Sequence, residues 1–92
     1  MSAMNMAFSS NPFYESTQLR FKLLAPQQVM LEIFNADGNK VRTEVSGILP
    51  VGSHALSWSG LDDKGRELGA GQYFARLRIG QKNEVHRLIM LR

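Results

Sequence analysis

Short segments in which apolar and polar residues alternate are the feature that most limits how this chain can fold. In the clearest segment, Leu19, Phe21 and Leu23 share one face. Arg20 and Lys22 lie between them and point to the other face. A period of two with one charged face predicts a β-strand that is buried on one side only.

The same period recurs along the chain, and turn residues separate the segments. Strands are predicted over residues 17–24, 29–34, 41–45, 54–58, 73–79 and 84–91. Pro26 ends the first strand because it lacks the donor that a ladder needs. Asn35–Gly38 predicts a hairpin turn, residues 47–52 a connecting loop, and Gly80–Asn83 the last turn. The inward face of the last strand stays open, because Val85 and Leu88 point to opposite sides.

The inward residues follow from the alternation. They are predicted to be Val29, Leu31 and Ile33, then Val41, Thr43 and Val45, then Leu56 and Trp58, and finally Tyr73, Ala75, Leu77 and Ile79. Six or seven short strands with no helix predict an all-β antiparallel sandwich.

The 92 residues are enough for one small domain. The first ten, MSAMNMAFSS, combine neither a basic start nor a continuous apolar run, so they do not have the pattern of a signal peptide. We expect residues 1–10 to be a leader that is disordered or was introduced by cloning, and residues 11–92 to form the sandwich.

Composition excludes several classes of function. The absence of cysteine removes disulfides, thiol nucleophiles and thiolate metal sites. No apolar run approaches the roughly 18–20 residues of a membrane span. The formal charge of +3 is mild and the basic residues are spread along the chain, unlike a tail that binds nucleic acid.

Three polar segments contain residue types that can bind a metal ion or a phosphate. Asn35–Asn39 resembles the first residues of a calcium-binding loop, but the distal glutamate of such a loop is missing. A turn with positive φ at Gly38 accounts for the residue types of this segment. Asp62 and Asp63 are accompanied by basic residues and fit a solvated turn better than a metal site. Gly69–Gly71 lacks the lysine and helix of a phosphate loop. No metal or cofactor is predicted.

The two histidines do not suggest catalysis. His54 and His86 have no third ligand at metal-site spacing and are expected to be solvated on strand faces. Ser53, His54 and Asp62 would be the members of a hydrolase site, but no nucleophile elbow accompanies them, and so small a sandwich offers little room for a substrate cleft. The chain is therefore predicted not to be an enzyme.

Five basic residues would form a stripe if their strands were neighbours. They are Arg20, Lys22, Arg76, Arg78 and Arg87. Such a stripe could contact an acidic partner, an anionic polysaccharide or nucleic acid, or it could serve solubility and the protection of sheet edges. Few aromatic residues flank these positions, so nucleic acid is not expected as a partner.

An ordered series of residues connects the chain to a known family. It includes the structural signature Asn11, Pro12, Phe13, Asp37, Gly38, Trp58, Gly60 and Gly65, followed by Gly71, Tyr73 and the closing segment 87–92. With these residues the chain resembles the C-terminal sorting domain of proteins exported by the bacterial type IX secretion system. That domain is closely related to the Ig-like domain of flagellar hook-capping proteins. The resemblance implies an Ig-like, fibronectin III-like sandwich.

The resemblance also implies a non-catalytic sorting and anchoring function. The outer-membrane secretion machinery and a sortase-like peptidase would act on the domain at the end of a larger cargo. The cargo would pass through the periplasm to the cell surface or the medium. The implied recognition residues are Gly71, Tyr73, Arg87, Leu91 and Arg92, with the last strand read at its edge.

Two other functions stay open. The first is a passive Ig-like module, a spacer or docking surface of a secreted protein or hook-cap scaffold, in contact with its parent domain. The second is a carbohydrate-binding sandwich, which needs a planar row of exposed aromatic residues. The candidates for such a row are Phe34, Phe74 and Tyr14.

Overall fold

Seven β-strands make up the fold in the computed structural model, which describes residues 3–91. They are β1 (Ala3–Phe8), β2 (Thr17–Leu23), β3 (Gln27–Asn35), β4 (Lys40–Leu49), β5 (Gly52–Trp58), β6 (Gly71–Ile79) and β7 (Lys82–Met90). Within residues 3–91 no helix has the length and hydrophobicity that crossing a membrane requires.

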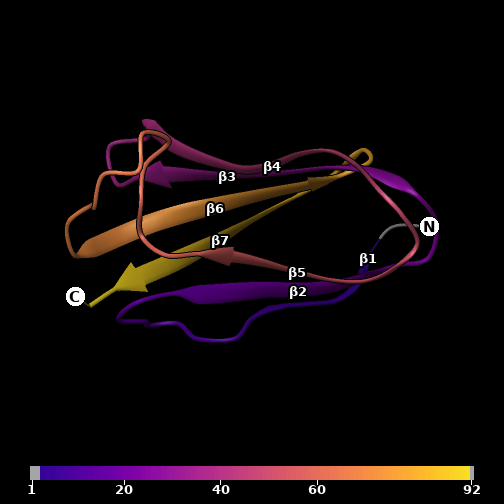
Figure 1. Cartoon of the computed structure of the whole chain (residues 1–92), viewed down its shortest axis with the longest axis horizontal. Coiled ribbons are helices and arrows are strands. Elements are labelled where there is room, and N and C mark those ends of the chain that lie inside the picture. Colours follow the sequence, from indigo (N-terminus) through magenta and orange to yellow (C-terminus); the bar gives the residue numbers. More distant parts are fainter. Residues whose placement is uncertain (1–2, 92) are drawn as a thin grey trace.

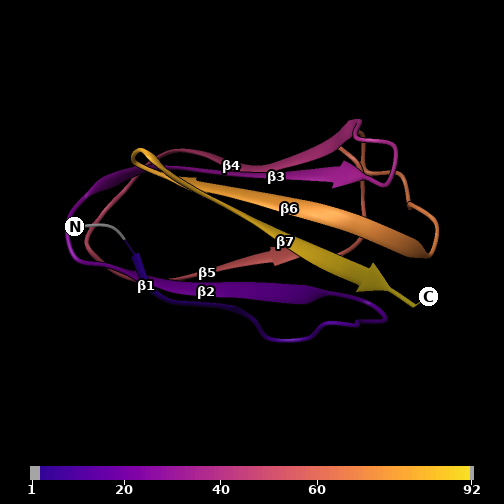
Figure 2. The same ribbon diagram turned by 180° about the vertical axis from the view of Figure 1, so that it is seen from behind.

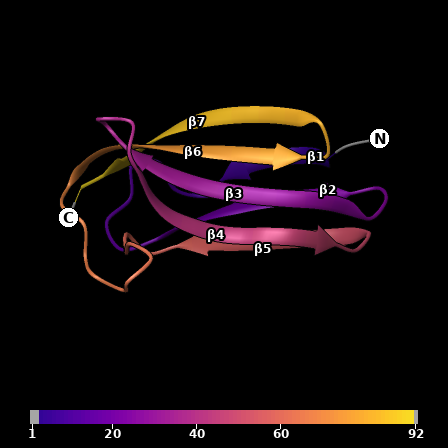
Figure 3. The same ribbon diagram turned by 90° about the horizontal axis from the view of Figure 1, so that it is seen from above.

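The strands form two antiparallel sheets that pack face to face (Figure 1). Sheet A has the order β1-β2-β5, and sheet B has the order β4-β3-β6-β7. Figure 3 shows the four strands of sheet B side by side. The turn between β3 and β4, the loop between β5 and β6 and the C-terminal end lie at one end of the sandwich, opposite the N-terminal end (Figure 2). The all-β Ig-like sandwich expected from the alternation is confirmed.

The core lies between the two sheets and consists of the residues that alternate inward. It contains Phe13, Leu19, Phe21, Leu23, Val29, Leu31, Ile33, Trp58, Tyr73, Ala75, Leu77, Ile79, Leu88 and Met90, each at most 7% exposed. Period-two burial in β2 and β6 places their charged residues outside. The inward assignments for β2, β3 and β6 are confirmed, as is that of Trp58, and Leu56 packs against the core while partly buried.

Two segments predicted to lack strand structure belong to strands. Ala3–Phe8, within the expected leader, forms β1 and pairs with β2. Residues 47–49, predicted to begin a loop, continue β4, so only Pro50 and Val51 separate it from β5. In both cases backbone pairing with a neighbouring strand extends the sheet where the side-chain pattern gives no signal.

The inward row predicted for β4 is confirmed in part, and the open inward face of β7 is settled. Val41 and Val45 pack against the core while partly buried, as predicted. Two register shifts interrupt the β3–β4 ladder, so Thr43 lies opposite Glu32 instead of continuing the inward row. Leu88 and Met90 of β7 are buried, whereas Val85 is 62% exposed and faces out. Val85 and Leu88 do point to opposite faces, and burial of Leu88 identifies the inner one.

Candidate docking surface and capped sheet edges

Asn11, Pro12 and Phe13 cover the outer edge of β7. Phe13 forms a parallel bridge with Met90, its N–H donates to the Ile89 carbonyl (2.9 Å), and its carbonyl accepts from the Leu91 N–H (2.8 Å). The Asn11 side chain donates to the Arg87 carbonyl (2.6 Å) and accepts from the Ile89 N–H (3.0 Å). The segment therefore satisfies backbone groups that an edge strand would otherwise offer to another chain.

Asp63 covers the other outer edge of sheet B in a similar way. Its N–H donates to the Val41 carbonyl (3.0 Å), and its carboxylate accepts from the Thr43 N–H (2.9 Å). Asn11 and Asp63 lie at the same end of the sandwich. Each caps its edge through a short side chain whose oxygen accepts a hydrogen bond from a backbone N–H. Sheet B is therefore closed to strand addition at β4 and β7 near this end.

Replacing Asn11 with alanine tests the cap on β7. The loss of two hydrogen bonds should destabilise the chain by about 1–2 kcal/mol, measured by urea unfolding. The uncovered edge should also increase self-association, measured by sedimentation at rising protein concentration. Asn39→Ala, in the exposed β3–β4 turn, is the matched control. Equal stability and equal association of the two variants would contradict the capping role.

The loop between β5 and β6 is held by Asp62. Its carboxylate accepts from the backbone N–H groups of Lys64 and Arg66, both at 2.9 Å, and from the Arg66 guanidinium at 3.1 Å. These bonds, led by that from the Arg66 backbone, hold the pKa of Asp62 below its ordinary value. Gly65 has φ +78, which L-residues rarely adopt, and its N–H donates to the Asp62 carbonyl. The acidic and basic residues of this segment thus stabilise a turn.

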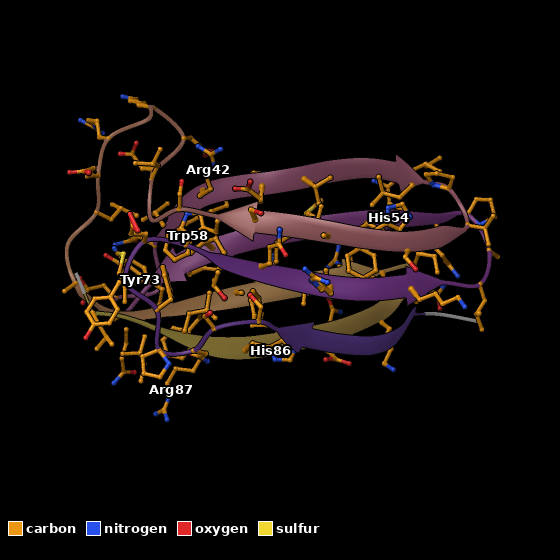
Figure 4. All side chains as sticks on the ribbon, turned by 60° about the horizontal axis from the view of Figure 1, so that its bottom comes forward. Arg42, His54, Trp58, Tyr73, His86 and Arg87 are labelled. Carbon is orange, nitrogen blue, oxygen red and sulfur yellow. The ribbon has the colours of Figure 1, made fainter. Side chains whose placement is uncertain are left out.

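Tyr73 and Trp58 pack into the core at the end of the sandwich where this loop lies (Figure 4). Their rings meet edge to face with centroids 5.3 Å apart, and Trp58 contacts Phe13 at 5.8 Å. The Tyr73 hydroxyl donates to the Gly69 carbonyl (2.7 Å) and the Trp58 indole N–H donates to the Leu61 carbonyl (3.0 Å). Tyr73 is only 7% exposed, so a partner has little of its side chain to touch.

The remaining signature and recognition residues lie in different places. Gly38 has φ +88 in the β3–β4 turn beside Asp37, and Gly60 is buried with φ +77. Gly71 is exposed at the start of β6, and Arg87 is exposed on β7. Leu91 is 44% exposed, whereas Arg92 lies outside the described residues. The structure brings Arg87 and Leu91 to one end of β7 but does not place Tyr73 on the surface with them. Their role in recognition stays a prediction.

Neither histidine is fully solvated, contrary to the prediction. His54 stacks on Phe21 with centroids 5.5 Å apart, and its Nε2 lies 2.8 Å from the Pro50 carbonyl oxygen. His86 contacts Phe8 at 5.5 Å and its Nε2 lies 3.0 Å from a Glu84 oxygen. Both residues lie on the inner side of an outer strand, where the core only partly covers them.

Ser53, His54 and Asp62 do not come together as a catalytic site. His54 lies at the end of the sandwich opposite the loop that contains Asp62 (Figure 4). Ser53 and His54 are neighbours on a strand, so their side chains point to opposite faces. Across residues 3–91 no three His, Asp or Glu side chains gather as metal ligands would.

The predicted basic stripe is divided between the two sheets. Arg20 and Lys22 lie on the outer face of sheet A, opposite Ala55 and Ser53 of β5. Arg76, Arg78 and Arg87 lie on the outer face of sheet B. The stripe requires the β2 strand to neighbour β6 and β7, and the sandwich places them in different sheets.

The outer face of sheet B combines aromatic, aliphatic and charged side chains. By alternation with the buried residues, its members are Met30, Glu32 and Phe34 of β3, Phe74, Arg76 and Arg78 of β6, and Val85, Arg87 and Ile89 of β7. Phe34 and Phe74 are partners across the β3–β6 ladder, and Arg87 is the partner of Phe74 on β7. The two aromatic residues proposed for a sugar-binding row are therefore adjacent. Tyr14 lies outside this ladder, in the segment between β1 and β2.

Glu32 is the buried centre of this face. Its carboxylate accepts from the Arg76 guanidinium at 2.6 Å and lies 3.4 Å from the Lys40 ammonium. The hydrogen bond from Arg76 is the main cause that lowers the pKa of Glu32 below its ordinary value, against the opposing effect of burial. Arg76 also lies over the Phe34 ring, 5.3 Å from its centroid, and so covers one face of that ring.

Sequence reasoning missed the role of Glu32. A signal was present, because Glu32 is the single charged residue within Val29–Phe34, and a carboxylate in such a segment needs a cationic partner. The identity of that partner depends on the β3–β6 register, which places Arg76 directly opposite Glu32.

Stability should decrease in acid because of Glu32 and Asp62. Folding lowers the pKa of both carboxyls, so their contribution is complete above the unfolded value of about 4. It is lost as the pH falls through that value toward the folded pKa. Urea unfolding from pH 7 to pH 2.5 should show this decrease, and Glu32→Gln should reduce it and lower stability at pH 7 by about 1–2 kcal/mol. Exposed Glu15→Gln is the control, and an unchanged pH profile in Glu32→Gln would refute the assignment.

Comparison with known proteins supports one part of the resemblance. A family model, the FlgD Ig-like domain, matches residues 10–79. A search of curated proteins found no match. The matched region covers Asn11–Phe13 and continues to the end of β6, so the predicted recognition residues Arg87, Leu91 and Arg92 lie beyond it.

Proposed function

Because the chain belongs to the FlgD Ig-like domain family, we propose that it is a passive structural and docking module of a hook-cap scaffold or a larger secreted protein. The family is structural and non-catalytic, in keeping with the prediction that the chain is not an enzyme. An Ig-like module of this kind acts through contacts with other proteins.

The observation that carries the proposal is the capping of sheet B at both outer edges. The Asn11 and Asp63 contacts occupy backbone groups that would otherwise recruit further strands. A module with such caps does not pair its edge strands with those of neighbouring copies, even when many copies are close together, as in a scaffold. Contacts with neighbours then have to be made by side-chain faces.

A second candidate function is type IX sorting. It is favoured by the exposure of Arg87 and Leu91 near the C-terminal end of β7. In this function the export machinery would read these side chains while the domain stays folded. The N–H of Leu91 is already bonded to Phe13, so reading by strand addition would first require that bond to open.

One experiment separates the two functions. A reporter with an ordinary signal peptide is fused ahead of residues 1–92, because β1 pairs with β2, and expressed in a type IX-competent host. A twin lacks Leu91 and Arg92, and circular dichroism of both purified domains verifies folding. The passive module predicts that both reporters stay in the periplasm. Surface reporter with the whole chain, lost in the folded twin, would establish sorting and overturn the passive module.

Docking itself is tested separately with the parent protein. The module is exchanged in the parent for an unrelated Ig-like domain of similar length, and assembly is followed by sedimentation. A passive spacer tolerates the exchange, whereas a docking module does not. Assembly that also survives deletion of the module would contradict both the spacer and the docking role.

A further inference from the structure

We propose that the outer face of sheet B binds an extended acidic protein segment that presents apolar side chains and carboxylates in turn along one side. This inference deepens the proposed docking function and rests on it. It commits to one kind of partner, an extended segment rich in Asp or Glu with aliphatic or aromatic residues between them.

The outer face of sheet B has an excess of positive charge. Arg76, Arg78 and Arg87 lie on this face, and Lys40 reaches it from β4. Glu32 is the carboxylate among them, and it lies between Arg76 and Lys40. One carboxylate does not balance four cations, so the face is electropositive and favours a negatively charged partner.

The cations of this face differ in whether they have an acidic partner. Arg76 is held by Glu32, and its guanidinium lies over Phe34. Arg78 donates to the neutral side chain of Asn83 at 3.1 Å, which leaves its charge uncompensated by that contact. Arg87 is exposed one strand away. Arg78 and Arg87 are therefore the groups that would receive carboxylates, while Arg76 keeps the aromatic surface in place.

Apolar side chains lie beside these cations on the same face. Val85 is 62% exposed, and Ile89 and Phe74 are partly buried around Arg87. On β7 the order Val85, Arg87, Ile89 places an apolar, a cationic and an apolar side chain on one face at intervals of about 7 Å. Alternate residues of an extended segment have the same spacing and share one side, so a segment whose side facing the sheet carries apolar, acidic and apolar residues in turn matches this row.

The outer face of sheet A provides the contrast. Arg20 and Lys22 give it positive charge, but their partners across β5 are the small residues Ala55 and Ser53. That part of sheet A can attract an anion but offers little apolar contact. Nucleic acid is also a poorer fit to sheet B, because base stacking needs open ring faces and Arg76 covers that of Phe34.

The test is a titration of the ¹⁵N-labelled 92-residue chain with three synthetic 12-residue peptides. The first, the Glu-Val peptide, repeats Val-Ser-Glu-Ser, so that Val and Glu alternate along one side of the extended chain. In the second peptide Ser replaces each Val, and in the third Lys replaces each Glu. The first peptide should change the amide chemical shifts of β6 and β7. The second should bind at least about tenfold more weakly because it lacks apolar contacts. The third should not bind.

Arg87→Glu and Arg20→Glu form the matched pair of variants, since each lowers the net charge of +3 by the same two units on opposite sheets. Arg87→Glu should weaken binding of the Glu-Val peptide about tenfold, and Arg20→Glu should change it less than twofold. Circular dichroism shows that both variants are folded.

Several outcomes would overturn the proposal. They are no binding of the Glu-Val peptide, equal weakening by the two variants, shifts confined to β2 and β5, or tighter binding of an oligothymidylate of the same charge. The parent exchange described above distinguishes this failure from failure of the docking function. If that exchange disrupts assembly while no acidic peptide binds, docking stands and uses another partner chemistry.

Discussion

Replacing Trp58 with alanine should lower the free energy of unfolding by about 3–5 kcal/mol. The side chain is 2% exposed and contacts the rings of Phe13 and Tyr73. Its indole N–H also satisfies the Leu61 carbonyl. Small domains have roughly 5–15 kcal/mol of stability, so this one change would remove a large part of it.

The measurement is urea unfolding followed by far-UV circular dichroism, because Trp58 is the single tryptophan and its fluorescence is lost in the variant. Trp58→Phe should fall between the wild type and alanine, since it keeps a ring but loses the hydrogen bond. Exposed Ser57→Ala is the control on the same strand. A loss below about 1 kcal/mol in Trp58→Ala would show that this ring cluster does not hold the two sheets together.

Tyr73→Ala is expected to have the second largest effect, a loss of about 3–4 kcal/mol. The ring fills the core beside Trp58 and is 7% exposed. Tyr73→Phe removes only the hydroxyl that donates to the Gly69 carbonyl. Because Gly69 is exposed and water can replace that bond, the phenylalanine variant should lose about 0.5–1.5 kcal/mol.

This pair also separates a packing role from a recognition role. If Tyr73 acts through packing, Tyr73→Phe should behave as the wild type in both the reporter export and the parent assembly experiments. Loss of either function in a Tyr73→Phe domain that is still folded would instead mean that a partner reads the hydroxyl. Gln72→Ala, the exposed neighbour on β6, is the control for a general effect of substitution on this strand.

Much of the fold could be predicted because one-sided burial leaves a period of two in the sequence. Leu19, Phe21 and Leu23 show that period clearly, and each is buried. The period fails for the residues around Thr43, because two register shifts in the β3–β4 ladder change which residues face inward. It also fails for Ala3–Phe8, which became a strand through pairing with β2. Strands pair through backbone hydrogen bonds, which do not require particular side chains, so the sequence pattern gives no sign of this pairing.

The candidate site was less predictable, because it depends on contacts between distant parts of the chain. Arg76, Arg78 and Arg87 were recognised as outward-facing, and Phe34 and Phe74 as candidate exposed aromatic residues. Their gathering on one face required the order β3-β6-β7. The same order excluded Arg20 and Lys22 from the stripe. The capping role of Asn11 depends on Arg87 and Ile89, 76 and 78 residues further along.

The sequence by itself determined the strands with one buried face, the turn at Asp37 and Gly38, and the absence of thiol chemistry, because these follow from local spacing and residue type. Only the tertiary structure decided which strands are neighbours, and with that the Glu32–Arg76 pair, the caps on sheet B and the composition of its outer face. The physical reason is that side-chain alternation encodes which face of a strand is buried, whereas the order of strands is chosen by the packing of the whole core.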